Sequence, residues 1–151
     1  METIEPAMVD DIPQLAELLN LLFTQEAEFR SDPQKQLRGL RMIIESPQTG
    51  IIFLARSESG VAGMVSLLFT ISTAEGGPVC WLEDMVVRPE HRGEGLGSQL
   101  LERAIEYASE HRFSRISLLT DRVNNGAIRF YGKHGFEESA MTALRLRIRQ
   151  A

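Results

Sequence analysis

Two segments near the N-terminus carry hydrophobic residues at the spacing of an α-helix. Apolar residues recur every three or four positions between residues 12 and 23 and again between residues 37 and 44. Asp10 to Pro13 and Asp32-Pro33 each place an aspartate just before a proline, which suits an N-cap followed by proline in the first turn. Ser46-Pro47 would end the second segment. The pattern therefore predicts two amphipathic helices.

The middle of the chain changes to a strand pattern. Ile51 to Arg56 and Val61 to Ile71 are rich in apolar and β-branched residues and predict a hairpin. A third strand is expected from Val79 to Val87, and helical spacing returns from Leu96 to Glu110. Ile116 to Leu119 is a short apolar run that suits a strand inside a sheet. This strand–helix–strand unit predicts a parallel pair within the sheet.

The C-terminal part predicts one more helix and two strands. Asn124 to His134 has helical character, and Phe136 to Ser139 and Ala143 to Ile148 are expected strands, the last alternating apolar and basic residues. Ile4 to Pro6 would be a short first strand. Together these elements predict an α/β (α+β) fold with a mixed, mainly antiparallel central sheet flanked by helices. A single domain is expected over residues 1–151.

Composition and charge narrow the classes of partner. The formal net charge is −5, which argues against a nucleic-acid surface. The first residues are acidic where a secretory signal is basic, and no run approaches the ~20 apolar residues of a membrane span, so we expect a cytoplasmic protein. Cys80 lies in an apolar stretch, which predicts a buried thiol. The three histidines are far apart in the sequence, so no metal site is expected.

The strongest chemical signal is a glycine-rich turn between the third strand and the helix that follows. Its residues are Arg92, Gly93, Glu94, Gly95, Leu96, Gly97 and Ser98. Glycines let a backbone turn tightly, and the N–H groups at a helix start favour a bound anion. The Gly-Lys-Ser/Thr ending of a Walker loop is absent, and the glycine spacing differs from G-x-G-x-x-G. The alternative is a glycine-rich turn that binds no ligand.

Two blocks of the sequence resemble one enzyme family. Arg92 to Gly97 resembles the Q/R-x-x-G-x-G/A signature of the GNAT superfamily of N-acetyltransferases, and Asn124 to Phe136 resembles its N-x-x-A-x-x-F-Y-x-x-x-G-F block. The resemblance covers about Ile51 to the end of the chain. It implies acetyl-CoA as cosubstrate, with the pyrophosphate of coenzyme A at the glycine-rich turn. It implies no metal.

The resemblance also assigns roles to single residues. The backbone of Met85, Val86 and Val87 would bond the pantetheine arm, although these side chains can equally be sheet core. Asn124 resembles the asparagine that binds the cofactor arm, and its other interpretation is a helix N-cap. Tyr131 would be the general acid that protonates the leaving thiolate, because a phenol keeps its proton at neutral pH. Its alternative role is packing.

The general base has two candidates. Glu83 and Asp84 lie in an otherwise apolar strand, where burial of a carboxylate is costly without a partner or a role. Successive strand residues face opposite sides, so only one of them would face the substrate unless a bulge intervenes. The Leu82-Glu83-Asp84 segment resembles polyamine-type members of the family, in which the glutamate polarises the amine. We therefore favour Glu83 as base, with Asp121 as the alternative.

The expected reaction is direct transfer of an acetyl group to a primary amine of a small molecule. A protein or peptide N-acetyltransferase and a non-catalytic CoA-binding module are the alternatives, and a homodimer stays open. Candidates for the substrate side come from the first two helices and the loop before the third strand; they are Phe23, Glu26, Phe29, Ser72, Thr73 and Glu75.

Overall fold

The computed structural model describes residues 2–25 and 30–150, and its contacts divide the chain into two units, Met1–Leu119 and Thr120–Ala151. Each unit is described by itself. The first unit contains, in order, β1 (Thr3–Pro6), a one-turn 3-10 helix (Val9–Asp11), α1 (Ile12–Gln25), α2 (Pro33–Ile44), β2 (Gly50–Ser57), β3 (Gly60–Ser72), β4 (Gly77–Val87), a second one-turn 3-10 helix (Pro89–His91), α3 (Leu96–Glu110) and β5 (Ile116–Ser117).

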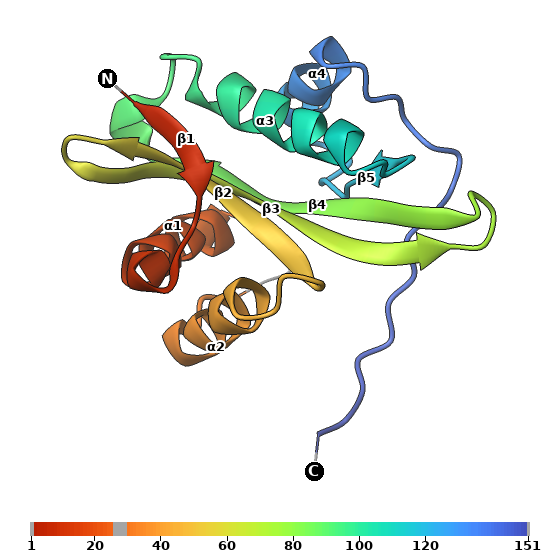
Figure 1. Ribbon diagram of the computed structural model, residues 1–151, viewed down its shortest axis with the longest axis horizontal. Coiled ribbons are helices and arrows are strands. Elements are labelled where there is room, and N and C mark those ends of the chain that lie inside the picture. Colours follow the sequence, from red (N-terminus) through yellow and green to blue (C-terminus); the bar gives the residue numbers. More distant parts are fainter. Residues whose placement is uncertain (1, 26–29, 151) are drawn as a thin grey trace. The chain divides into compact units, whose positions relative to one another are not determined.

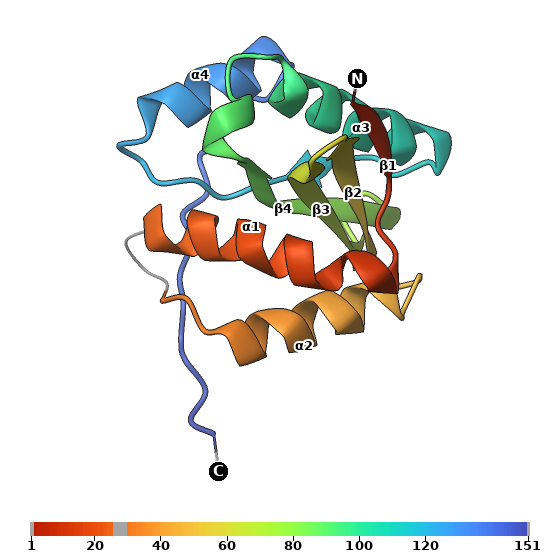
Figure 2. The same cartoon turned by 90° about the vertical axis from the view of Figure 1, so that its left-hand side faces the viewer.

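The sheet of the first unit runs β1-β2-β3-β4-β5. The pairs from β1 to β4 are antiparallel, and β4 and β5 are parallel, with Cys80 beside Ile116. This confirms the mixed, mainly antiparallel sheet and the parallel strand–helix–strand unit. β5 is shorter than the predicted Ile116 to Leu119. Figures 1 and 2 show α1 and α2 on one face of the sheet and α3 on the other.

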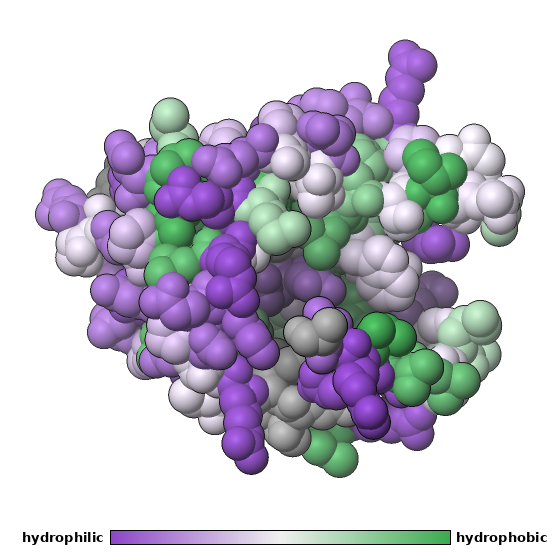
Figure 3. All heavy atoms as spheres, turned by 90° about the horizontal axis from the view of Figure 1, so that it is seen from below, coloured by the Kyte–Doolittle hydropathy of each residue, from purple (hydrophilic) through white to green (hydrophobic). Residues whose placement is uncertain are grey.

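Alternation along the strands divides the core between the two faces. Ile52 and Met64 pack with buried leucines of α1 and α2, whereas Phe53 points to α3, where its ring lies 5.6 Å from that of Tyr107. A strand period of two sends neighbouring side chains to opposite faces, so the same run of β2 serves both layers. Figure 3 views the protein from below Figure 1 and shows hydrophilic and hydrophobic residues intermingled on this surface, with hydrophilic residues more frequent.

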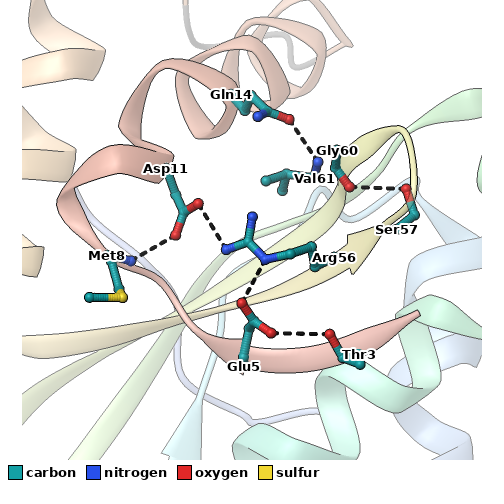
Figure 4. A network of polar contacts seen from close by, with 9 residues as sticks. All are labelled: Thr3, Glu5, Met8, Asp11, Gln14, Arg56, Ser57, Gly60 and Val61. Carbon is teal, nitrogen blue, oxygen red and sulfur yellow. Dashed lines mark hydrogen bonds and ion pairs between the residues drawn. The ribbon is translucent and has the colours of Figure 1, made fainter. Parts of the chain in front are cut away.

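A polar network ties β1, the start of α1 and β2 together (Figure 4). The Arg56 guanidinium donates through Nε to Glu5 Oε1 at 2.6 Å and through a terminal nitrogen to Asp11 Oδ1 at 2.9 Å. The second oxygen of Asp11 accepts from the Met8 N–H at 2.9 Å. The predicted direct N-cap of α1 by Asp10 or Asp11 is therefore wrong, because Asp11 reaches back to close a 3-10 turn that precedes α1.

The second helix begins as predicted. Asp32 caps α2, and its carboxylate accepts from the N–H groups of Gln34 at 3.2 Å and Lys35 at 3.3 Å. The buried Gln36 side chain donates to the Ala16 carbonyl at 3.1 Å, which joins α2 to α1. None of the helices in the described ranges has the length and apolar character needed to cross a membrane.

The second unit contains α4 (Asn125–Lys133). The strands expected at Phe136 to Ser139 and Ala143 to Ile148 are wrong, because residues 136–150 form no strand in the described structure. Leu144 and Leu146 are 93% and 82% exposed. Alternation makes a segment able to form a strand, but a strand also needs a neighbour for its N–H and C=O groups, and this segment has none within its unit.

Candidate functional site

A β-bulge in β4 sets the direction of Glu83. Met64 lies opposite Val86 and Ser66 lies opposite Glu83, so two steps along β3 correspond to three along β4. The extra residue lies at Asp84-Met85, and Asp84 has a φ of 54°, which is uncommon for a residue with a side chain. A bulge shifts the alternation by one position. Glu83 and Val86 therefore both face α1 and α2, and the bulge that strict alternation of Glu83 and Asp84 would have excluded is present.

The Glu83 carboxyl is partly shielded from water. Although the residue as a whole is exposed, enough protein surrounds the carboxyl that burial raises its pKa above the ordinary value. Burial disfavours the charged form of an acid, and a carboxyl with a raised pKa is a better proton acceptor than an ordinary one. Glu83, the base candidate that lies in the first unit, therefore has a carboxyl that accepts a proton more readily than an ordinary one.

The glycine-rich turn follows β4 after the one-turn 3-10 helix Pro89–His91 and is held against the end of the strand. Arg92 donates through Nε to the Val87 carbonyl at 3.3 Å. Gly93 and Gly95 then have φ values of +84° and +83°. A Cβ at either glycine would meet nothing within 4 Å, so the backbone conformation, and not crowding, requires glycine at these two positions.

The turn ends at the first residue of α3. Gly95 is the N-cap and has no side chain to cover the helix start, while Leu96 is 1% exposed and anchors the helix in the core. The N–H groups of a helix's first turn have no acceptor within the helix, and they carry partial positive charge. The acid of the turn, Glu94, lies 3.2 Å from Nδ1 of His91. This end of α3 can therefore hold an anion such as a diphosphate.

The residues proposed for the pantetheine arm lie along an open edge of β4. The β4–β5 ladder consists of Cys80 with Ile116 and Trp81 with Ser117. In the first unit as described, no strand therefore flanks this edge from Leu82 to Val87. Val86 is 5% exposed and belongs to the core with α1, so its side chain is structural. Main-chain groups on the open edge can still bond a ligand, so the two roles do not compete.

Three predicted residues lie in the second unit. The Tyr131 ring makes edge contacts with Phe130 at 5.1 Å and Phe136 at 5.6 Å, and burial raises the pKa of Tyr131 to about 12. Its phenol therefore holds its proton at neutral pH. Asn124 caps α4, because its Oδ1 accepts from the Ala127 N–H at 3.0 Å. Asp121 is exposed, and its main-chain carbonyl accepts from the Asn124 N–H at 3.0 Å.

The remaining predictions are resolved in part. Cys80 is 1% exposed, and burial raises the pKa of its thiol to about 11, which confirms a buried, unreactive cysteine. Glu75 lies in the turn before β4, 3.7 Å from an Arg115 nitrogen, and its N–H donates to Ser72 Oγ at 3.1 Å. Glu26 and Phe29 lie outside the described residues.

Sequence reasoning missed one residue beside Glu83. Ser66 lies directly opposite it on β3 and is 0% exposed. The signal was present, because Ser66 is the one polar residue in the run from Val61 to Phe69. The sequence alone does not show that Ser66 lies beside Glu83, because this depends on how β3 pairs with β4.

Fold and site together define a class of protein. A bulged strand with one open edge leads into a glycine turn at a helix start, which suits an α/β protein that holds an extended ligand with an anionic group at one end. The profile of the Acetyltransferase (GNAT) family matches residues 12–136. The chain belongs to this family of acetyltransferases.

Known proteins agree with this assignment. YhfO of Bacillus subtilis (strain 168), described as an uncharacterized N-acetyltransferase, is 30% identical over 120 residues, which cover 78% of this chain and 80% of YhfO. Streptothricin acetyltransferase A of the same organism is 42% identical over 55 residues, covering 36% of this chain and 32% of that protein, so this chain matches only about a third of its length. A predicted acetyltransferase from Clostridium acetobutylicum, solved with acetyl-CoA, shares the fold with a TM-score of 0.80 and 18% identity, covering 97% of this chain and 96% of that one.

Proposed function

We propose that this protein transfers an acetyl group from acetyl-CoA to a primary amine of a small molecule. One observation carries the proposal: the bulge in β4 directs Glu83 toward α1 and α2, and the same strand is followed, after one turn of 3-10 helix, by the glycine turn at the start of α3. A carboxylate base and an anion site thus lie along one continuous segment. The solved relative that contains acetyl-CoA and the relative named for streptothricin support the choice of cosubstrate and of a small-molecule acceptor.

The cosubstrate would lie along the open edge of β4. The helix start at Leu96 and the turn from Arg92 to Ser98 would hold its diphosphate, and main-chain groups of Met85, Val86 and Val87 would bond the pantetheine arm. Asn124, besides capping α4, would contribute a polar contact to that arm.

Glu83 would begin the reaction by accepting a proton from the substrate ammonium, with Asp121 as the alternative base. The neutral amine then attacks the thioester carbonyl carbon, which forms a C–N bond and a tetrahedral intermediate with an oxyanion; the C–S bond breaks when this intermediate collapses. The main-chain N–H at Val86 would stabilise the transient oxyanion. Tyr131, whose pKa of about 12 keeps it protonated, would donate its proton to the departing thiolate, and its phenolate would regain a proton from the attacking nitrogen, which must lose one to become an amide.

Ligand-dependent stability tests the cosubstrate. A ligand that binds only the folded state at ~100 times its dissociation constant adds about 2.7 kcal/mol to the free energy of unfolding. We expect a clear rise in melting temperature with acetyl-CoA or CoA and little change with NAD or ATP. No shift at millimolar CoA would overturn the assignment.

Turnover then tests the acceptor. Release of free thiol from acetyl-CoA should be measured against polyamines, amino acids, aminoglycosides, streptothricin and short peptides. We expect turnover with one of the small amines. Turnover confined to peptides would replace the small-molecule acceptor by a protein, and CoA binding without turnover on any amine would favour a binding module.

A further inference from the structure

Ser66 has an unsatisfied hydroxyl in the core. It lies within β3, is 0% exposed, and is the one residue in the described structure whose buried side-chain nitrogen or oxygen lacks a hydrogen-bond partner. Burying a hydroxyl without a partner destabilises the folded state, and an alanine there would avoid that cost. Such a group therefore indicates a role outside packing.

The strand register places this hydroxyl beside Glu83. Ser66 and Glu83 are direct cross-strand partners, immediately before the bulge in β4. Side chains of such partners lie on the same face, with Cβ atoms about 4.5–5.5 Å apart. A change in the Glu83 side-chain torsions is enough to bring its carboxylate within hydrogen-bond reach of Ser66 Oγ.

Few other polar groups face Glu83. The sequences of β3 and β5 contain no titratable residue. α1 contributes Glu17, whose carboxylate is bound by Arg88 at 2.8 Å, and β4 itself contributes Asp84 at the bulge. The charged residues of α2 are Lys35, Arg38 and Arg41, all of them exposed, and Arg41 pairs with Glu45 at 3.2 Å. α3 packs on the opposite face of the sheet (Figures 1 and 2). Ser66 is thus the hydroxyl donor that the cross-strand pairing brings to Glu83.

We propose that Ser66 is a positioning residue for Glu83: its hydroxyl donates a hydrogen bond to the ionised carboxylate and directs it toward the α1 and α2 side of the sheet. The catalytic consequence rests on the proposed function of Glu83 as base, but the hydrogen bond itself does not. Because burial disfavours the ionised form, a donor that binds only that form keeps more of the base ready to accept a proton. Proton transfer from the substrate ammonium to the carboxylate then weakens this bond.

The titration of Glu83 tests the pair directly. The side-chain carboxyl carbon of Glu83 should be followed by ¹³C NMR against pH in the full chain, and assigned by its loss in Glu83→Gln. We expect Ser66→Ala to raise the pKa of Glu83 by at least ~0.5 unit, which is about a threefold change in its acid dissociation constant, because loss of a donor to the charged form favours the neutral form. Thr70→Val removes a hydroxyl from an exposed position of β3 opposite Val79 and should leave the titration unchanged.

A purely structural Ser66 gives the opposite result. If Ser66→Ala leaves the Glu83 titration within ~0.2 unit of the unmodified protein while raising the melting temperature, the hydroxyl is an unsatisfied core group and the proposal fails. This titration uses no acetyl donor or amine, so it is decided separately from the transferase function. With an amine that turns over, Ser66→Ala should also move the acidic limb of kcat/KM to higher pH, and should have no such effect in the Glu83→Gln background.

Discussion

At the scale of single residues, burial shifts the pKa of two groups for which we propose roles in the reaction. The Glu83 carboxyl and the Tyr131 phenol both have raised pKa values, and in both cases burial is the cause. A raised pKa makes the Glu83 carboxyl a better proton acceptor, whereas it makes the Tyr131 phenol a weaker acid that stays protonated at neutral pH.

Replacing Glu83 should stabilise the fold while removing activity. Its pKa in the folded state lies above the ordinary 4.5, so the folded protein holds this proton more tightly than the unfolded chain does. The resulting contribution to the free energy of unfolding is fully present below the unfolded pKa and is lost as pH rises through the folded pKa. Glu83→Gln removes the ionisation, and we expect a higher melting temperature than the unmodified protein near pH 8 and nearly equal values near pH 4. Turnover should fall at least ~100-fold, as for loss of a general base. Melting curves across pH and thiol release measure the two effects.

Equal melting temperatures of Glu83→Gln and the unmodified protein at both pH values would contradict the raised pKa of the Glu83 carboxyl. Full activity of Glu83→Gln would transfer the base role to Asp121, and Asp121→Asn is the matched variant for that outcome.

Tyr131→Phe tests the acid. The change removes one hydroxyl and leaves the ring, so the contacts with Phe130 and Phe136 are kept. We expect kcat to fall at least ~10-fold at neutral pH with CoA affinity nearly unchanged, because general acid catalysis typically contributes 10²–10⁴-fold and water can replace part of it. Turnover within about twofold of the unmodified protein, with chemistry limiting the rate, would leave Tyr131 with a packing role only.

At the scale of elements, the link from β4 to α3 joins the proposed base to the proposed anion site. The strand supplies a bulge and an open edge, and the helix supplies its N–H groups. The turn between them keeps two glycines at positive φ, and Arg92 fastens it to the strand end at Val87. These parts act through main-chain geometry, so substitutions that alter the backbone should affect them most.

Gly95→Asp should abolish CoA binding through both shape and charge. It places a side chain at a φ of +83° and a negative charge where a diphosphate would bind. Gly76→Asp is the matched control, because Gly76 also has positive φ, +72°, and open space around it, but lies in the β3–β4 turn. Both variants should lose about 1–2 kcal/mol of stability from backbone strain. Only Gly95→Asp should lose CoA binding by calorimetry, and normal binding by that variant would make the loop a simple turn.

At the scale of the whole molecule, the first unit depends on long-range ties as well as its core. Arg56 joins Glu5 and Asp11, residues distant in sequence, and holds the edge strand β1 against the start of α1 (Figure 4). The Asp11 side chain is 8% exposed, so without Arg56 its carboxylate would keep little solvation and lose its charged partner.

Arg56→Met should therefore lower the free energy of unfolding by about 2 kcal/mol, the range for hydrogen bonds to charged groups. Arg41→Met is the control: Arg41 pairs with Glu45 on the surface of α2, where both side chains are more than half exposed, and its loss should change stability by less than ~0.5 kcal/mol. Urea unfolding of both variants measures the difference.

The effect of Arg56→Met should also depend on pH. Because Arg56 lowers the pKa of Glu5, the difference in the free energy of unfolding between Arg56→Met and the unmodified protein should narrow as pH falls below the ordinary glutamate pKa. Similar losses for the two variants would show that the network is no stronger than a surface pair.

Local patterns in the sequence predicted much of this molecule. Helical spacing located α3 from Leu96 to Glu110, and the Asp32-Pro33 pair located the start of α2. The glycine spacing from Gly93 to Gly97 predicted a tight turn at a helix start, because turn conformation and helix N-termini depend on residues near one another in the chain. The family followed from two short blocks for the same reason.

Tertiary structure alone decided which residues meet. The bulge at Asp84 depends on how β4 pairs with β3, and no pattern within β4 reveals the register of its neighbour. The same register brings Ser66 to Glu83. In the second unit, Ala143 to Ile148 alternates like a strand yet forms none, because alternation describes what a segment can bury, whereas hydrogen bonding to a neighbouring strand decides whether it becomes part of a sheet.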